Sequence, residues 1–216
     1  MPRTWDPESA APAEAMARLV AGNQRFVAAG GAVSTSAGQP WSESLATSAQ
    51  RPFAVIVGCS DSRMPVEIVF DQGFGDLFVA RIIGNVCAPS VIASVEFAAA
   101  QLGTRLVVVM GHTRCGAVTA AVNTIASGAG PDSEHIRSIT DRITPHIEGL
   151  VRPGSAADNA VVREAVHANV RASADQLRHG SRQLEDLVIA GRVAVLGAVY
   201  ELETGAVHFL DRPPGE

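Results

Sequence analysis

Two short segments of the chain carry residues that could bind a metal and act on a substrate beside it. Cys59 follows the apolar stretch 53–57, and His112 and Cys115 follow the apolar stretch 106–110. Two thiolates and an imidazole are typical zinc ligands, and three protein ligands leave the fourth tetrahedral position open. An open zinc site is typical of hydrolytic or hydration chemistry, because it lowers the pKa of bound water. We therefore predict Cys59, His112 and Cys115 as ligands of one Zn²⁺.

The spacing within the second segment favours this interpretation. His112 and Cys115 are three positions apart, so one tight turn or helical turn could present both side chains to the same ion. Gly111 and Gly116 flank the pair, and glycine permits close approaches that a side chain would hinder. Cys87 has no partner at metal spacing, and a single cysteine is most often a small buried hydrophobe. We expect Cys87 to be a core or interface thiol.

Asp61 and Arg63 lie between the predicted ligands, two positions apart. On an extended segment their side chains would point the same way, and a guanidinium can hold a carboxylate through paired, charge-assisted hydrogen bonds. Such a pair would keep Asp61 ionised and aim its free oxygen at zinc-bound hydroxide. Released from Arg63, the same carboxylate could occupy the fourth zinc position. A purely structural ion pair is the alternative interpretation.

The surrounding elements must bring the two segments together. Apolar stretches without polar alternation, separated by helical stretches, are typical of a parallel sheet covered on both faces. The expected strands are 53–57, 77–83, 106–110 and 193–200, with 208–210 as an antiparallel edge strand. The expected helices are 13–29, 65–70, 90–102, 117–127, 133–150 and 159–190. The predicted fold class is α/β, with a mainly parallel central β-sheet flanked by helices and an N-terminal helical arm.

In such sheets, ligand sites lie beyond the carboxyl ends of the strands. Cys59 directly follows the first expected strand, and His112 and Cys115 follow the third. If these strands are neighbours, their loops converge on one point. The sequence therefore predicts one shared site.

Composition limits the remaining possibilities. The 216 residues are 47% hydrophobic and have a formal net charge of −5, which favours one globular domain over 1–216 and argues against a nucleic-acid partner. We expect residues 1–40 to form the helical arm and a linker. No stretch is apolar enough for a membrane span, and no secretory signal is apparent. Three cysteines do not suggest a disulfide framework, so we expect a reducing, cytoplasmic location.

Two motifs resemble those of the β-class carbonic anhydrases. They are Cys-Ser-Asp-Ser-Arg at 59–63 and Gly-His-Thr-Arg-Cys-Gly at 111–116, and Gly-Asn-Gln-Arg-Phe at 22–26 extends the similarity. The resemblance implies a zinc enzyme that reversibly hydrates carbon dioxide to bicarbonate and a proton. It also implies that Cys59, His112 and Cys115 hold the zinc and that Asp61 and Arg63 form a catalytic dyad. The implied assembly is a homodimer or homotetramer with active sites near the subunit interface.

The same resemblance implies four substrate-binding residues. Gln50 and the backbone N–H of Gly116 would bind bicarbonate oxygens, while Phe78 and Ile83 would line an apolar cleft suited to carbon dioxide. Members with a regulatory bicarbonate site carry a tryptophan three residues before the first ligand, where this chain has Ile56. We therefore expect water at the fourth zinc position and no regulation by such a bicarbonate site.

Other departures from the family pattern are local. The chain reads Arg-Ile-Ile-Gly-Asn at 81–85, where many members have Arg-Asn-x-x-Asn, and Phe97 stands where tyrosine is common. Two alternative functions remain on the same residues. One is hydrolysis of carbonyl sulfide or carbon disulfide, and the other is a non-catalytic, zinc-stabilised scaffold. A thiol redox enzyme is disfavoured, because the chain has no Cys-x-x-Cys pair.

Overall fold

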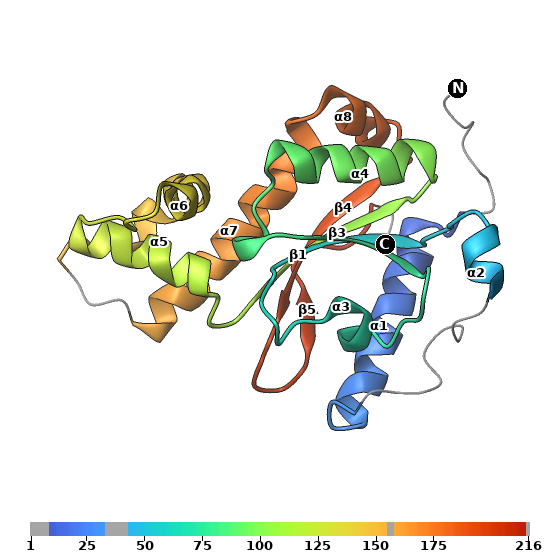
Figure 1. Ribbon diagram of the computed structural model, residues 1–216, viewed down its shortest axis with the longest axis horizontal. Helices are drawn as coiled ribbons and strands as arrows, with labels where there is room; N and C mark the ends of the chain where they lie inside the picture. The colour runs from blue at the N-terminus through green and yellow to red at the C-terminus, as the bar shows by residue number, and fades with distance from the viewer. Residues whose placement is uncertain (1–8, 33–42, 155–157, 215–216) are drawn as a thin grey trace.

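The computed structural model describes residues 9–32, 43–154 and 158–214. Its centre is a five-stranded sheet with the strand order β2-β1-β3-β4-β5, in which β5 alone is antiparallel to its neighbour (Figure 1). The strands are β1 (Ala54–Gly58), β2 (Leu77–Arg81), β3 (Leu106–His112), β4 (Ala194–Tyr200) and β5 (Val207–Phe209). The predicted α/β class with a mainly parallel central sheet is therefore confirmed.

Helices cover both faces of this sheet. The helices that the structure describes are α1 (Pro12–Ala28), α2 (Glu43–Thr47), α3 (Val66–Val69), α4 (Pro89–Gln101), α5 (Gly116–Ser127), α6 (Glu134–Ile147), α7 (Asn159–His179) and α8 (Arg182–Ile189), with the 3₁₀ turns η1 (Ile83–Asn85) and η2 (Glu148–Leu150). In Figure 1, α4 and α8 lie on one side of the strands and α1 and α3 on the other. No helix among the described residues is long and apolar enough to cross a bilayer.

The strand sequences explain why the sheet is central. Every residue of β1, β3 and β4 is buried, as expected for parallel strands packed on both faces. By contrast, β2 lies at an edge, and its residues are half-buried or exposed. The sequence of β2 is nearly as apolar as those of the buried strands, so its exposure follows from its edge position.

The N-terminal helix α1 packs on the body of its own chain. Asn23 donates hydrogen bonds to the carbonyls of Val69 and Gly205, at 3.1 and 2.9 Å, and Arg25 forms an ion pair with Asp71. A side chain at Gly22 would collide with the carbonyl of Phe70. Much of the predicted 30–40 linker lies outside the described residues. Within the described part, the arm is a docked helix.

The structure differs from the predicted elements in several details, among them the strand predicted over 77–83, which ends at Arg81. The stretch 159–190 was expected to be a single helix, but α7 ends at His179 and α8 starts at Arg182. Ser181 causes the break, because its hydroxyl caps α8 by accepting from the N–H of Leu184 and also donates to Glu96. The short helix α2 was not predicted, since its five residues carry too little periodicity to be recognised.

The sheet register brings the two predicted metal-binding segments together. β1 and β3 are parallel neighbours with Gly58 opposite Met110, so Cys59 and His112 leave the sheet at the same edge. On the other side of β3, His112 lies opposite Tyr200 at the end of β4. Beyond this edge, α5 and α6 extend away from the strands (Figure 1).

Candidate metal centre

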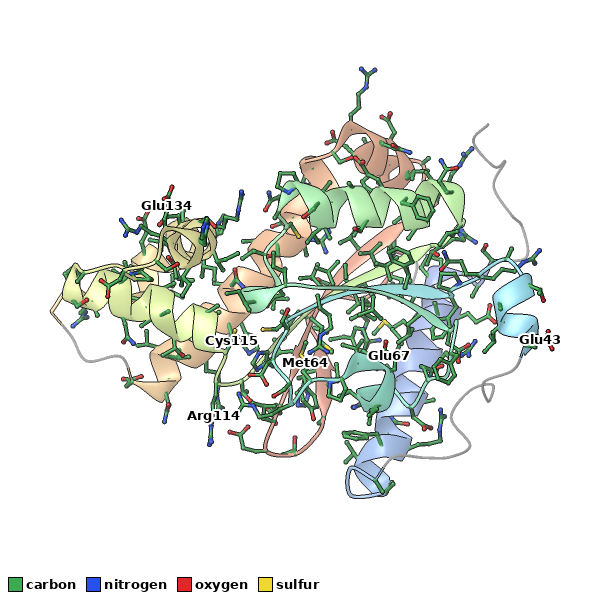
Figure 2. The ribbon with its side chains drawn as sticks, in the orientation of Figure 1. Glu43, Met64, Glu67, Arg114, Cys115 and Glu134 are labelled. Carbon is green, nitrogen blue, oxygen red and sulfur yellow. The ribbon has the colours of Figure 1, made fainter. Side chains whose placement is uncertain are left out.

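Three side chains converge at the carboxyl edge of the sheet. The potential ligand atoms of Cys59, His112 and Cys115 all lie within 4.8 Å of one another, and all three residues are buried. Cys59 directly follows β1, His112 ends β3, and Cys115 precedes the first residue of α5. Figure 2 shows Cys115 at the start of α5. Two thiols and an imidazole at this spacing match the ligand set of a zinc site.

The imidazole of His112 has one nitrogen held and the other free for a ligand. Its Nδ1 lies 2.9 Å from the carbonyl oxygen of Thr113, which requires Nδ1 to carry the proton. Its Nε2 is buried and, within the described part of the chain, has no hydrogen-bond partner. A buried polar atom without a partner is costly, whereas a neutral imidazole with one nitrogen anchored is a typical metal ligand. The residues therefore fit a metal ion.

The two thiols interact strongly with each other. A hydrogen bond from the Cys115 side chain lowers the pKa of Cys59, and the same contact raises the pKa of Cys115. The contact therefore favours the thiolate at Cys59. The thiolate is the form that binds metals, so the site is already prepared for a cation.

Backbone groups around Cys59 support its negative charge. The N–H of Gly84 donates to the Sγ of Cys59 at 3.3 Å, and the carbonyl of Gly84 accepts from Nδ2 of buried Asn169 at 2.8 Å. Gly84 has a φ of 70°, a left-handed conformation that favours glycine. Sequence patterns did not identify Asn169, because one asparagine in an Ala- and Val-rich helical stretch carries no motif.

Asp61 and Arg63 form the predicted ion pair, but they lie in a turn and not on the extended segment from which the pair was predicted. Nε and Nη2 of Arg63 lie 2.9 and 2.7 Å from the two carboxylate oxygens of Asp61. This pairing holds the pKa of Asp61 well below its usual range. Oδ2 of Asp61 is 3.9 Å from Nε2 of His112, which places an ionised carboxylate at the mouth of the cluster. Arg81 donates to the carbonyl oxygens of Cys59 and Asp61, at 2.9 and 2.6 Å.

The four residues predicted to bind substrate are distributed differently. Gly116 directly follows Cys115, and the space where a side chain would project is open. Ile83 precedes Gly84 in η1 and is 42% exposed. Phe78 lies in the middle of β2, and its ring packs against Phe97 at a centroid distance of 6.3 Å. Gly116 and Ile83 are thus chain neighbours of Cys115 and of Gly84, whereas Phe78 packs against Phe97 of α4.

Gln50 lies at the other end of its strand. It precedes β1 by four residues, whereas Cys59 directly follows that strand. The five residues of β1 alone span about 13 Å, at roughly 3.3 Å per residue. Gln50 is therefore separated from the metal ligands of its own chain.

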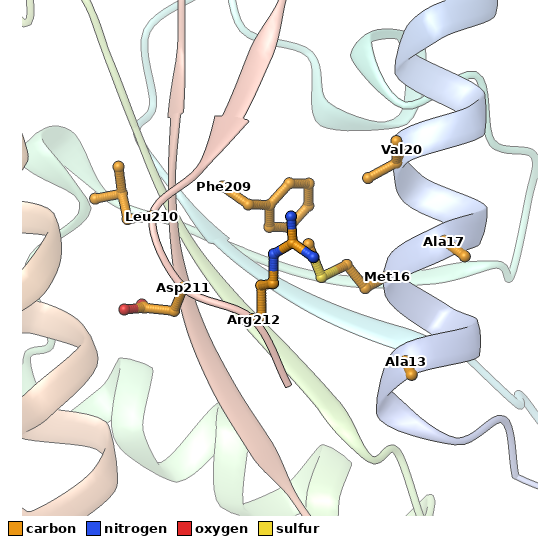
Figure 3. Close-up of a pocket in the computed structure, with 8 residues that line it drawn as sticks. All are labelled: Ala13, Met16, Ala17, Val20, Phe209, Leu210, Asp211 and Arg212. Carbon is orange, nitrogen blue, oxygen red and sulfur yellow. The ribbon is translucent and has the colours of Figure 1, made fainter. Parts of the chain in front are cut away.

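A separate hollow of about 450 Å³ lies between α1 and the segment that follows β5 (Figure 3). Met16 and Val20 line it from α1, Phe209 lines it from the end of β5, and Arg212 lines it from the segment that follows. Phe209 pairs with Ala198, two residues before the end of β4. None of the residues lining this hollow belongs to the cluster of Cys59, His112 and Cys115, so the hollow is not part of the metal centre.

Comparison with known proteins decides the family. A family model described as carbonic anhydrase matches residues 54–207, which include all three potential ligands. A carbonic anhydrase of Mycolicibacterium smegmatis is 40% identical over 197 residues, covering 91% of this chain and 92% of the relative. Carbonic anhydrase 2 of Mycobacterium tuberculosis is 37% identical over 207 residues, covering 93% of each. The chain belongs to the β-carbonic anhydrase family.

Solved structures agree with this assignment of the fold. The β-carbonic anhydrase CafA of Aspergillus fumigatus superimposes with a TM-score of 0.67 at 27% identity, covering 78% of this chain and 79% of that one. A tetrameric β-carbonic anhydrase of Sordaria macrospora gives a TM-score of 0.67 at 24% identity, covering 77% and 84%. The chain is accordingly an enzyme of the carbonic anhydrase type, with a Cys-His-Cys group at the strand ends of its fold.

Proposed function

We propose that this β-carbonic anhydrase reversibly hydrates carbon dioxide to bicarbonate and a proton, with Zn²⁺ held by Cys59, His112 and Cys115. The observation that carries the proposal is the buried Nε2 of His112. It has no hydrogen-bond partner in the described part of the chain and lies within 4.8 Å of two thiol sulfurs. When bound, zinc supplies hydroxide at near-neutral pH by lowering the pKa of water.

The proposed role of Asp61 is to orient the attacking oxygen. An ionised carboxylate accepts hydrogen bonds only, so it fixes the direction of any O–H that points toward it. Arg63 holds both carboxylate oxygens, and Arg81 holds the backbone carbonyl of the same residue. Asp61 is therefore preorganised, which is how positioned groups lower a reaction barrier without reorganising during the step.

Gly116 and Ile83 are the proposed substrate contacts on the same subunit. The N–H of Gly116 starts α5 beside Cys115, and helix N-terminal N–H groups favour negative charge such as that of bicarbonate. Ile83 presents an exposed apolar side chain next to Gly84, which contacts Cys59. Carbon dioxide has no strong hydrogen-bonding group, so an apolar wall suits it.

We further propose that a second copy of the chain completes the site, as a homodimer or as part of a homotetramer. The edge strand β2 and the adjacent helix α4 expose an apolar face that includes Phe78 and Phe97, of which Phe97 is 48% exposed. Edge strands with apolar surroundings are natural pairing surfaces. A β-carbonic anhydrase of Sordaria macrospora with the same fold is tetrameric. Gln50 and Phe78 would then serve the metal of the partner subunit.

A reducing compartment such as the cytoplasm is the proposed location. The three cysteines are free and buried, and two of them must remain thiolates to bind metal. Oxidation of Cys59 to a disulfide with Cys115 would remove both ligands. The prediction of a single domain over 1–216 likewise stays a proposal.

A stopped-flow pH-indicator assay on protein of measured zinc content tests the function. We expect carbon dioxide hydration that scales with zinc content up to one zinc ion per subunit and is lost on chelation. Fully zinc-loaded protein that does not accelerate hydration would contradict the proposal and support the zinc-stabilised scaffold. Running the same preparation with carbonyl sulfide and carbon disulfide tests the sulfur-substrate alternative. Faster turnover of either one than of carbon dioxide would favour that alternative.

A further inference from the structure

The turn between β4 and β5 contacts the loop that carries two of the three potential ligands. This turn includes Glu203, and the loop runs from His112 to Cys115 through Thr113 and Arg114. Figure 2 shows Arg114 and Cys115 on this loop, where β3 leads into α5. Glu203 lies outside the motifs at 22–26, 59–63 and 111–116, and it is far from the loop in sequence.

Glu203 contacts both residues between the two ligands. Its Oε2 accepts a hydrogen bond of 3.0 Å from Oγ1 of Thr113, and its Oε1 lies 2.9 Å from Nε of Arg114. One carboxylate therefore holds the side chains of two consecutive loop residues. Arg114 has a φ of 57°, an uncommon value for a residue other than glycine, so the loop adopts a conformation that needs external support.

Thr113 links Glu203 to the imidazole of His112. Its Oγ1 also accepts from the N–H of Leu202 at 3.0 Å, and its own N–H donates to the carbonyl of Tyr200 at 3.0 Å. Its carbonyl oxygen lies 2.9 Å from Nδ1 of His112. Thr113 is thus fixed at three polar groups, and one of them sets the tautomer and orientation of the imidazole.

We propose that Glu203 is a positioning residue, which holds the Thr113–Arg114 turn so that His112 and Cys115 face the same metal ion. The inference rests on the proposed zinc ligands and adds a residue outside the family motifs. Partners that orient ligands in this way typically change metal affinity by about 10- to 100-fold when they are removed. The contacts of the Glu203 carboxylate are with Thr113 and Arg114, so its effect on the metal would pass through these two residues.

The test measures zinc release from the loaded protein to a chromogenic chelator, at a temperature well below unfolding. We expect Glu203→Ala to release zinc about 10-fold faster than the wild type. Glu203→Gln keeps an acceptor for Thr113 but loses the charge that faces Arg114, so its rate should lie between the two. Glu201→Gln is the matched control, because Glu201 lies in the same turn but accepts from Thr204. It should release zinc at the wild-type rate.

Two further measurements separate positioning from general loosening of the turn. With Co²⁺ in place of zinc, Glu203→Ala should shift the visible absorption bands, whereas Glu201→Gln should not. In a Thr113→Val background, Glu203→Ala should add less than it does alone, because the link through Thr113 is already lost and only the one through Arg114 remains. Full additivity would overturn the inference, and so would wild-type zinc release from both Glu203 variants or equal acceleration by Glu201→Gln.

The outcomes also distinguish this inference from the proposed function. If the wild-type chain binds no stoichiometric zinc, the ligand assignment itself is wrong. If it binds zinc tightly and Glu203→Ala binds it equally well, only the role of Glu203 is wrong. Should Glu203→Ala fail to fold, Glu203→Gln decides, and a wild-type release rate in that variant would reject the role.

Discussion

The backbone N–H of Gly84 donates to the Sγ of Cys59 across 3.3 Å. Gly84 follows the edge strand β2, whereas Cys59 follows its neighbour β1, so the contact joins the two loops. An N–H aimed at a thiolate lowers the pKa of the thiol and limits where the sulfur can move. The metal centre is therefore shaped by backbone groups as well as by its three ligand side chains.

Asn169 maintains that contact from α7. We expect Asn169→Ala to lower the free energy of unfolding by about 1–3 kcal/mol, because the buried carbonyl of Gly84 loses its side-chain donor. Zinc should also be released faster, since the N–H of Gly84 is no longer held. Urea unfolding and chelator-monitored release measure the two effects. Unchanged values for both would show that Gly84 is held by other contacts.

Cys59→Ser should abolish zinc binding and carbon dioxide hydration together. The serine hydroxyl stays protonated near neutral pH and is a poor replacement for a thiolate. Zinc binding is measured by atomic emission and hydration by stopped flow, both on the same sample. Cys87→Ala is the matched control, because Cys87 is buried but contacts the carbonyl of Ser173 and not the cluster. Full zinc occupancy in Cys59→Ser would remove Cys59 from the ligand set.

Asp61→Asn should retain zinc and lose about 100-fold or more in hydration rate, the scale typical of removing a general base or an electrostatic contact. The amide can no longer form the charged pair with Arg63. Asp76→Asn provides the control, since Asp76 pairs with Arg18 and Gly73. Hydration rates measured at a known zinc content test this prediction. A wild-type rate in Asp61→Asn would rule out the orienting role.

The stability of the protein should fall at alkaline pH because of Cys87. Burial raises the pKa of Cys87 to about 12, above the usual range of a thiol, so the folded chain holds this proton while the unfolded chain releases it. The stability that the protonated Cys87 thiol contributes is fully present below about pH 9 and is lost as the pH rises toward 12. At pH 10.5 the loss should reach about 2 kcal/mol.

Comparison with Cys87→Ala isolates this effect. The variant lacks the thiol, so its stability should change less than that of the wild type between pH 8 and pH 10.5. Lysine does not complicate the comparison of the two proteins, because all 17 basic residues are arginine and no lysine titrates in this range. Urea unfolding at both pH values provides the measurement. Equal pH dependence in the two proteins would contradict the assigned cause.

Phe97→Asp should weaken the proposed assembly. The side chain is 48% exposed on the β2–α4 face, and a buried carboxylate there would lack a partner. Sedimentation velocity should show a shift from dimer or tetramer toward monomer, with slower hydration if Gln50 and Phe78 act across the interface. Ile189→Asp, at a position 79% exposed at the end of α8, should leave the assembly unchanged. A monomeric wild-type chain would contradict the assembly itself.

The sequence by itself determined the elements and the ligand candidates, because both depend on local patterns. The uninterrupted apolar stretches that became β1, β3 and β4 indicated a parallel sheet, and the chemistry of Cys59, His112 and Cys115 indicated zinc. The ion pair of Asp61 and Arg63 was predicted correctly, although the backbone that brings them together is a turn and not an extended segment. The break at Ser181 was missed, because the cap that ends one helix and starts the next acts within an otherwise helical pattern.

Only the tertiary structure decided which groups surround these residues. The strand order makes β1 and β3 neighbours, and that adjacency brings Cys59 to His112. It also placed Gln50 at the other end of β1 from the ligands that it was predicted to serve. The contacts of Asn169 with Gly84 and of Glu203 with Thr113 join residues 85 and 90 positions apart. Such long-range contacts depend on how helices and turns pack on the sheet, and no local pattern encodes that packing.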